Sequence, residues 1–190
     1  MGTKGDAERP TVTHAVRYIG ERVTAALERV DPKAIGRAVD LLAHAPQIFV
    51  YGAGRSGIIG RAFAMRLVQA GLRAYVIGES VTPIVRRGDT VFLLSGQGES
   101  YSSMQTANIV RREGADLIVL TARPGSKIAH TATVLLTIEF AEDPDRPRYA
   151  PLGTLFESAS LRLTDSLVAE LLRTRGETED SMRRRHAIMV

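Results

Sequence analysis

The sequence contains no cysteine and no tryptophan, and aromatic residues make up 5% of the chain. Without cysteine, the chain can form neither a disulfide nor a thiolate nucleophile nor a thiolate metal site. The few aromatic side chains are not interleaved with basic residues, so they offer little for nucleic-acid bases to stack on. We therefore expect no disulfide framework, no thiol chemistry and no nucleic-acid partner.

Long apolar segments are missing as well. No hydrophobic run reaches the length of about 20 residues that crosses a bilayer, and no segment has the charged start and apolar middle of a signal peptide. The formal net charge of +4 is small, and much of it lies in Arg183–Arg185, where a solvated basic face is the simplest interpretation. We expect a cytoplasmic protein that binds no membrane.

A hydrophobic share of 44% over 190 residues is typical of one domain with a full core. Residues 1–10 show no periodicity and are expected to form a flexible tail, which leaves 11–190 as a single domain. Apolar residues at steps of three and four predict two helices before the first strand, at about 12–30 and from Pro32 past Leu42. The two would form a hairpin that packs on a sheet or on a partner subunit.

From residue 48 the pattern changes to short apolar runs that alternate with helical segments, which is typical of a parallel sheet covered on both faces. The proline- and charge-rich residues 141–150 are predicted to be a loop, and a last short helix from Thr178 is expected to carry Arg183 to His186. The predicted strands are 48–51, 74–77, 90–94, 117–120 and 134–138. The predicted helices between and after them end at about Ala70, span about 102–112, and run from Pro151 to about Arg175.

The strand at 90–94 stops at a loop of small and polar residues, Ser95–Ser100 (SGQGES), which we call the second loop. Gly96 and Gly98 let the backbone turn with its N–H groups exposed. The free donors and the dipole of the helix that opens near Ser102 attract an anion to the same point. The sequence therefore predicts a phosphate site formed by Ser95, Gly96, Gln97, Gly98, Glu99 and Ser100.

The first loop, Gly52–Gly57 (GAGRSG), matches the dinucleotide pattern G-x-G-x-x-G directly after a strand. Glu79 follows at the distance where an acid would bind a ribose hydroxyl, so a dinucleotide enzyme is one interpretation. The side chains of Arg55 and Ser56 can bind an oxyanion themselves, however. Two such loops at the carboxyl ends of parallel strands could face one crevice, and a sugar phosphate suits that crevice better than a pyrophosphate does.

Three segments at and after the first loop resemble the sugar isomerase (SIS) domain: GAGRSG, Ala64–Leu67 (AMRL) and Gly78–Pro83 (GESVTP). A narrower resemblance to the 6-phospho-3-hexuloisomerases is carried by SGQGES, Pro151–Glu157 (PLGTLFE) and Arg185–Ala187 (RHA). The second loop departs from the usual SGSGET at Gln97 and Ser100, and the chain ends in RHAIMV where the family usually has RHANLE.

The resemblance implies a five-stranded parallel sheet in an α/β/α sandwich, assembled as a homotetramer. It also implies that a sugar phosphate is the ligand, and that 3-hexulose 6-phosphate and fructose 6-phosphate are interconverted as in the ribulose monophosphate pathway of formaldehyde assimilation. No metal or nucleotide cofactor is implied, and His14, His44 and His130 show no ligand spacing.

Moving a carbonyl between C3 and C2 requires a base near carbon and a group that carries protons between oxygens. Glu157 is the candidate base, because partial burial in the first turn of a helix could raise its pKa towards neutrality. By position alone an acid there more simply complements the helix dipole, and the family resemblance reverses that preference.

His186 is the candidate proton shuttle, although a surface histidine on a basic helix is the plainer interpretation. A residue near the C-terminus can complete a neighbouring subunit's site, so we expect active sites that are shared between subunits. Arg55 would hold the phosphate or polarise the substrate's oxygens, or else form a surface ion pair. Besides the isomerase, a non-catalytic module that senses a sugar phosphate and a dinucleotide-dependent enzyme remain as alternatives.

Overall fold

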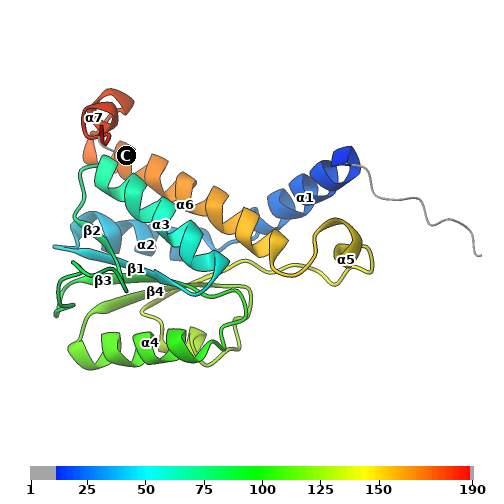
Figure 1. The fold of residues 1–190 in the computed structure, drawn as a ribbon, viewed down its shortest axis with the longest axis horizontal. Helices are drawn as coiled ribbons and strands as arrows, with labels where there is room; N and C mark the ends of the chain where they lie inside the picture. The colour runs from blue at the N-terminus through cyan, green and yellow to red at the C-terminus, as the bar shows by residue number, and fades with distance from the viewer. Residues whose placement is uncertain (1–11, 189–190) are drawn as a thin grey trace, which may run out of the picture.

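A computed structural model of the protein describes residues 12–188, so the expected tail at 1–10 lies outside the described residues (Figure 1). Five parallel strands form one sheet in the order β2-β1-β3-β4-β5. The strands are β1 (Ile48–Gly52), β2 (Ala74–Val76), β3 (Thr90–Leu94), β4 (Asp116–Thr121) and β5 (Val134–Thr137). The helices are α1 (Val12–Leu27), α2 (Pro32–His44), α3 (Arg55–Gln69), α4 (Tyr101–Glu113), α5 (Arg146–Tyr149), α6 (Thr154–Arg175) and α7 (Glu179–Arg184), with a 3-10 turn at Ala129–Thr131.

The sheet separates two apolar cores, because successive side chains of a strand point to opposite faces. In β3, Phe92 and Leu94 belong to the core under α2, α3 and α6, whereas Val91 and Leu93 belong to the core under α4. Figure 1 shows the same layers, with α3 and α6 on one side of the sheet and α4 on the other. Every residue of β3 is buried, as is expected for the central strand of a covered parallel sheet. The predicted α/β/α sandwich is confirmed.

The strand order changes direction between β1 and β3. The chain leaves β1 through α3 to form β2 on one side, and then returns to form β3 on the other side of β1. The connection after β3 goes through α4 on the opposite face. Where neighbouring parallel strands send their helices to opposite faces, the loops at their carboxyl ends part, and ligands bind between them. The first and second loops are these two loops.

The helices before the sheet follow their sequence signals. Asp31 caps α2 by accepting a hydrogen bond from the backbone N–H of Lys33 (2.9 Å), and Pro32 opens the helix. Neither helix is left to bury its apolar face alone: α2 packs on α6 and β5, and α1 packs on α6 and α5. Packing on the sheet, one of the two expected uses of this pair, is therefore present for α2, whereas α1 packs on other helices.

The prediction of a continuous loop at 141–150 was wrong over α5. Its Pro147 lies in the first turn, where a missing N–H breaks no helical hydrogen bond. The ring of Tyr149 packs against the ring of Tyr18 on α1, with centroids 5.3 Å apart. This contact joins residues far apart in the sequence, so no local pattern could announce it.

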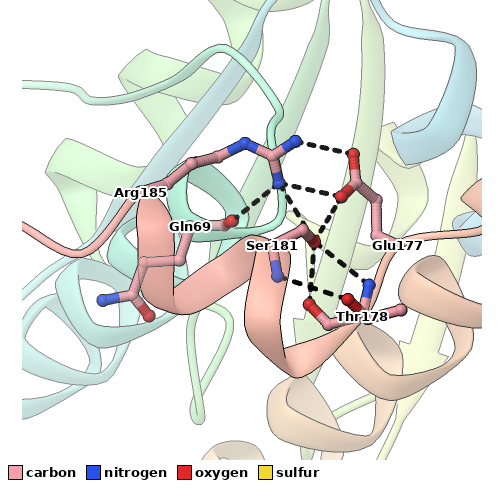
Figure 2. Close-up of polar contacts among 5 residues, drawn as sticks. All are labelled: Gln69, Glu177, Thr178, Ser181 and Arg185. Carbon is pink, nitrogen blue, oxygen red and sulfur yellow. Dashed lines mark hydrogen bonds and ion pairs between the residues drawn. The ribbon is translucent and has the colours of Figure 1, made fainter.

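The last helix is held to the rest of the domain by a polar cluster at the end of α3 (Figure 2). The Arg185 guanidinium donates to both carboxylate oxygens of Glu177 (2.8 and 2.9 Å) and to the carbonyl oxygen of Gln69 (3.3 Å). Ser181 donates to Glu177 as well (2.5 Å). The helix ends at Arg184, so the prediction that it carries His186 was wrong. Arg185 is the C-terminal cap, and its side chain also binds the end of α3, while His186 lies beyond the helix.

This cluster predicts a specific loss of stability in acid. Hydrogen bonds from Arg185 and then Ser181 lower the pKa of Glu177 from 4.5 to about 2. A carboxylate with a lowered pKa stabilises the folded state fully above pH 4.5, and that contribution disappears as the pH falls from 4.5 to about 2. The free energies of unfolding of the wild type and of Glu177→Gln, measured by urea denaturation, should therefore differ most above pH 4.5 and converge as the pH falls from 4.5 to about 2.

The Arg185→Gln variant serves as the partner test, because it removes the main donor that lowers the Glu177 pKa. It should lose most of the same pH-dependent stability. A constant difference between wild type and Glu177→Gln from pH 5 to pH 2.5 would show that the ion pair in Figure 2 does not stabilise the fold.

Candidate active site

The beginnings of α3 and α6 are joined by an ion pair. Arg55, the first residue of α3, donates from Nε to Oε2 of Glu157 in the first turn of α6, at 2.5 Å. The Glu157 side chain is 14% exposed, whereas that of Arg55 is 72% exposed. A hydrogen bond between two charged groups is stronger than a neutral one. The pair fixes the shielded carboxylate beside a cation that remains open to solvent.

The same turn of α6 also touches the second loop. A Cβ atom added to Gly96 would lie 2.9 Å from Cδ1 of Phe156, so the Phe156 ring packs directly against the loop backbone. Glu157 is the next residue along α6. The start of α6 therefore connects the first loop, through Arg55, with the second loop, through Gly96. This contact was not predicted, since Phe156 reads in the sequence as an ordinary core residue.

The conformation of the second loop depends on Gly98, because any other residue at this position would be strained. Gly98 has a φ of +66°, and a Cβ atom there would lie 2.1 Å from the Oγ atom of Ser126. Ser126 in turn accepts a hydrogen bond from the backbone N–H of Ala129 (3.3 Å). Sequence reasoning missed Ser126, and nothing in its neighbourhood in the chain marks it.

The side chains of the second loop divide into two groups. Ser95 is only 7% exposed, and its hydroxyl has no hydrogen-bond partner among residues 12–188. The Ser100 hydroxyl caps α4 by accepting from the N–H of Ser103 (3.4 Å), while Gln97 and Glu99 lie exposed. The Ser95 hydroxyl is thus available to a ligand, and Ser100 holds the helix start in place.

A cavity of about 290 Å³ lies beside the first loop, but on its β2 side. Its lining includes Gly54, Arg61 and Ile77 and no residue of the second loop. The expectation that both loops open into one crevice is therefore not met by this cavity; the start of α6 is what joins them. Arg61 pairs with Glu79 (2.9 Å), the residue that the dinucleotide interpretation assigned to a ribose hydroxyl.

The glycines of the first loop have a structural explanation of their own. A Cβ atom at Gly52 would lie 2.7 Å from the backbone carbon of Ser56, and one at Gly57 would lie 2.5 Å from the carbonyl oxygen of Gly52. The turn from β1 into α3 is too tight for side chains at either position. Packing at Gly52 and Gly57 and a φ of +57° at Gly54 therefore account for the G-x-G-x-x-G match without a dinucleotide.

His186 lies at the other end of the molecule from Glu157. The two are separated by the part of α6 that follows Glu157, residues 157–175, which spans about 27 Å at 1.5 Å per residue. Figure 1 shows α7 at the far end of α6, and Arg185 is bound there to the end of α3. The His186 ring makes its hydrogen bond locally, between Nδ1 and the carbonyl oxygen of Ala187 (2.8 Å). One subunit thus unites Arg55 and Glu157 with the second loop but excludes His186.

Among residues 12–188, no group of three or more His, Asp or Glu side chains is placed to hold a metal ion. Within the same residues, no helix combines the length and the apolar character that a membrane crossing requires.

Comparison with known proteins gives the family. The SIS domain profile matches residues 41–175. An uncharacterised protein of Archaeoglobus fulgidus is 34% identical over 178 residues (92% of this chain and 97% of the relative), and a 3-hexulose-6-phosphate isomerase of Methylomonas aminofaciens is 34% identical over 153 residues (80% and 84%).

Among solved structures, a Methanococcus jannaschii protein, whose structure led to an inferred function of 3-hexulose-6-phosphate isomerase, superimposes with a TM-score of 0.83. It is 26% identical, with 92% of this chain and 98% of that chain covered. The chain belongs to the SIS domain family.

Proposed function

We propose that the protein is a phosphosugar isomerase that interconverts 3-hexulose 6-phosphate and fructose 6-phosphate through an enediol. The observation that carries this proposal is the Glu157 carboxylate, held by Arg55 at 2.5 Å at the point where α6 meets the second loop. The similarity to 3-hexulose-6-phosphate isomerases over most of the chain supports the choice of substrate.

In the proposed mechanism the second loop binds the phosphate. The N–H groups at the start of α4, the hydroxyl of Ser95 and the positive end of the helix dipole all favour a dianion there. The exposed guanidinium of Arg55 and the Ser56 hydroxyl bind substrate oxygens from the side of the first loop. The phosphate anchors the sugar so that C2 and C3 lie beside Glu157.

Glu157 then removes the proton from one of these two carbons and returns it to the other. The C–H electron pair forms the C=C bond of the enediol, and the carbonyl oxygen takes a proton. Arg55 stabilises the negative charge that develops on the oxygens as the enediol forms. No cofactor is needed for this proton transfer, because the substrate carbonyl itself accepts the electron pair.

The transfer of protons between the two oxygens is assigned to His186 of another subunit. The part of α6 that follows Glu157, residues 157–175, is about 27 Å long and leads away from the site, so we assign the shuttle to the His186 of a neighbouring subunit. We propose a homotetramer with shared active sites, in which the end of one chain reaches the site of the next.

A sensor that binds a sugar phosphate without turning it over is the second candidate. It is favoured by the same separation of His186 from Glu157, because one subunit alone carries a binding site and a carboxylate but no second acid–base group. The two candidates differ in a single measurement, which is turnover of 3-hexulose 6-phosphate by the wild type.

The role of Glu157 is tested with Glu157→Gln in an assay coupled to fructose 6-phosphate formation. Removal of a general base should lower kcat by about 10²- to 10⁴-fold, while the affinity for fructose 6-phosphate changes little. The matched control is Glu170→Gln, the same substitution further along α6, where the carboxylate pairs with Arg173 at 2.6 Å. If the wild type does not turn over 3-hexulose 6-phosphate, the sensor is the remaining candidate. If Glu157→Gln and Glu170→Gln are equally active, Glu157 has no part in the mechanism.

The phosphate site is tested with Gly98→Ala, which forces a methyl group against Ser126 and strains a positive φ. Fructose 6-phosphate should raise the Tm of the wild type, because it binds the native state, and should raise that of Gly98→Ala much less. Gly125→Ala is the control, since a Cβ at Gly125 meets nothing within 4 Å. Stabilisation by NAD but not by fructose 6-phosphate would contradict the proposal.

Shared sites predict complementation. Glu157→Gln and His186→Ala oligomers should each be nearly inactive. A mixed oligomer contains sites that combine the intact Glu157 of one subunit with the intact His186 of another, so activity should return after unfolding and refolding the two variants together. Verified mixed oligomers with no recovered activity would rule out the assignment of His186 to a neighbouring site.

A further inference from the structure

The turn that leads into α6 has its glycine in an unexpected position. The N–H of Thr154 donates to the carbonyl oxygen of Pro151 (3.2 Å), so residues 151–154 close a four-residue turn. Leu152, the second residue, has a φ of +55°, while Gly153, the third, has a φ of −88° and a ψ of 6°. These angles fit a type II′ turn, in which glycine normally takes the second position. Here leucine carries the backbone strain, and glycine stands where any residue would fit.

The backbone of the turn therefore does not explain why residue 153 is a glycine, but its contact with Glu157 does. A Cβ atom on Gly153 would lie 2.9 Å from Oε1 of Glu157 and 3.3 Å from its carboxyl carbon. The carboxylate thus rests against the bare backbone of Gly153 on one side, and its other oxygen accepts from Arg55. A methyl group at position 153 would displace the carboxylate, because the end of a glutamate side chain gives way more easily than the backbone.

The strained turn is held from outside by α5. Nη1 of Arg146 donates to the carbonyl oxygen of Leu152 at 3.0 Å. α5 is itself fixed to α1, because the Tyr149 ring lies on the Tyr18 ring. The Leu152 side chain contributes nothing to this arrangement within the subunit, since Leu152 is 93% exposed. Relaxation of Leu152 to an ordinary backbone conformation is opposed by the Arg146 hydrogen bond from outside the turn and, within the turn, by the bonds from the Thr154 N–H and hydroxyl (2.6 Å) to the Pro151 carbonyl oxygen.

We propose that Gly153 and Arg146 are positioning residues for Glu157: Arg146 holds the turn in its strained form, and the turn lays the Gly153 backbone against the carboxylate. The proposal rests on the proposed function only in taking Glu157 as the base. Neither residue touches the substrate in this account; both act through the placement of one carboxylate.

The first test compares Gly153→Ala with Gly125→Ala. A reacting group misplaced by about 1 Å can lose about 100-fold in rate, so kcat of Gly153→Ala should fall towards that bound while KM stays within about twofold of the wild type. The ¹³C resonance of the Glu157 carboxyl, assigned by its loss in Glu157→Gln, should shift in Gly153→Ala and stay in place in Gly125→Ala. Unchanged kcat and an unmoved resonance in Gly153→Ala would overturn the role of Gly153.

The second test is a double-mutant cycle between Arg146 and Leu152. Loss of a hydrogen bond from a charged donor corresponds to about a tenfold change in the population of the turn, so Arg146→Ala should lower kcat by about tenfold. Glycine adopts a positive φ without strain, so in the Leu152→Gly background the turn no longer depends on Arg146. There, Arg146→Ala should change kcat by less than about twofold. Equal losses in both backgrounds would show that Arg146 does not act through the turn.

The carboxyl resonance separates this proposal from the proposed function. If the wild type does not turn over 3-hexulose 6-phosphate, the proposed isomerase function is wrong. The carboxyl resonance of Glu157 still decides whether these residues place the carboxylate, and it is compared in Gly153→Ala, Arg146→Ala and Leu152→Gly/Arg146→Ala. A shift in the first two that is reversed in the third supports positioning; an unmoved resonance in all three rejects it.

Discussion

The ion pair between Arg55 and Glu157 joins two helix starts that are 102 residues apart in the chain. It forms because α3 and α6 pack against each other on one face of the sheet, and β1 and β3 are neighbours, so the loops that follow these two strands lie at one edge. The start of α6 enters at that edge and touches both loops, through Arg55 on one side and Gly96 on the other. The site is therefore a consequence of strand order, and the chemistry proposed for it depends on this one shielded carboxylate.

The rest of the structure can be understood as support for that carboxylate. On one side α1 fixes α5, α5 holds the turn at Leu152, and the turn fits the Gly153 backbone against Glu157. At the far end of α6, Arg185 fastens the end of the chain to α3 and so determines where His186 can lie. In the proposed shared-site arrangement, the start of α6 belongs to the subunit's own site, and the segment after α6 presents His186 to another subunit.

Patterns that act locally predicted much of this fold. The Asp31–Pro32 start of α2, the apolar run Val91–Leu94 of β3 and the loop that follows it are determined by neighbouring residues, and the structure has them where the sequence places them. Contacts across the fold were not predictable in this way. Ser126 against Gly98 and Tyr149 on Tyr18 are long-range packing, and only the fold reveals that His186 and Glu157 lie at opposite ends of α6.

A crystal structure with fructose 6-phosphate bound would show whether one small molecule touches both loops and Glu157. We expect the phosphate at the N–H groups and the Ser95 hydroxyl of the second loop, Arg55 on a sugar oxygen, and the Glu157 carboxylate within reach of C2 and C3. A sugar phosphate seated in the cavity on the β2 side of the first loop, with Glu157 still bound to Arg55 and out of reach of those carbons, would contradict the proposed mechanism.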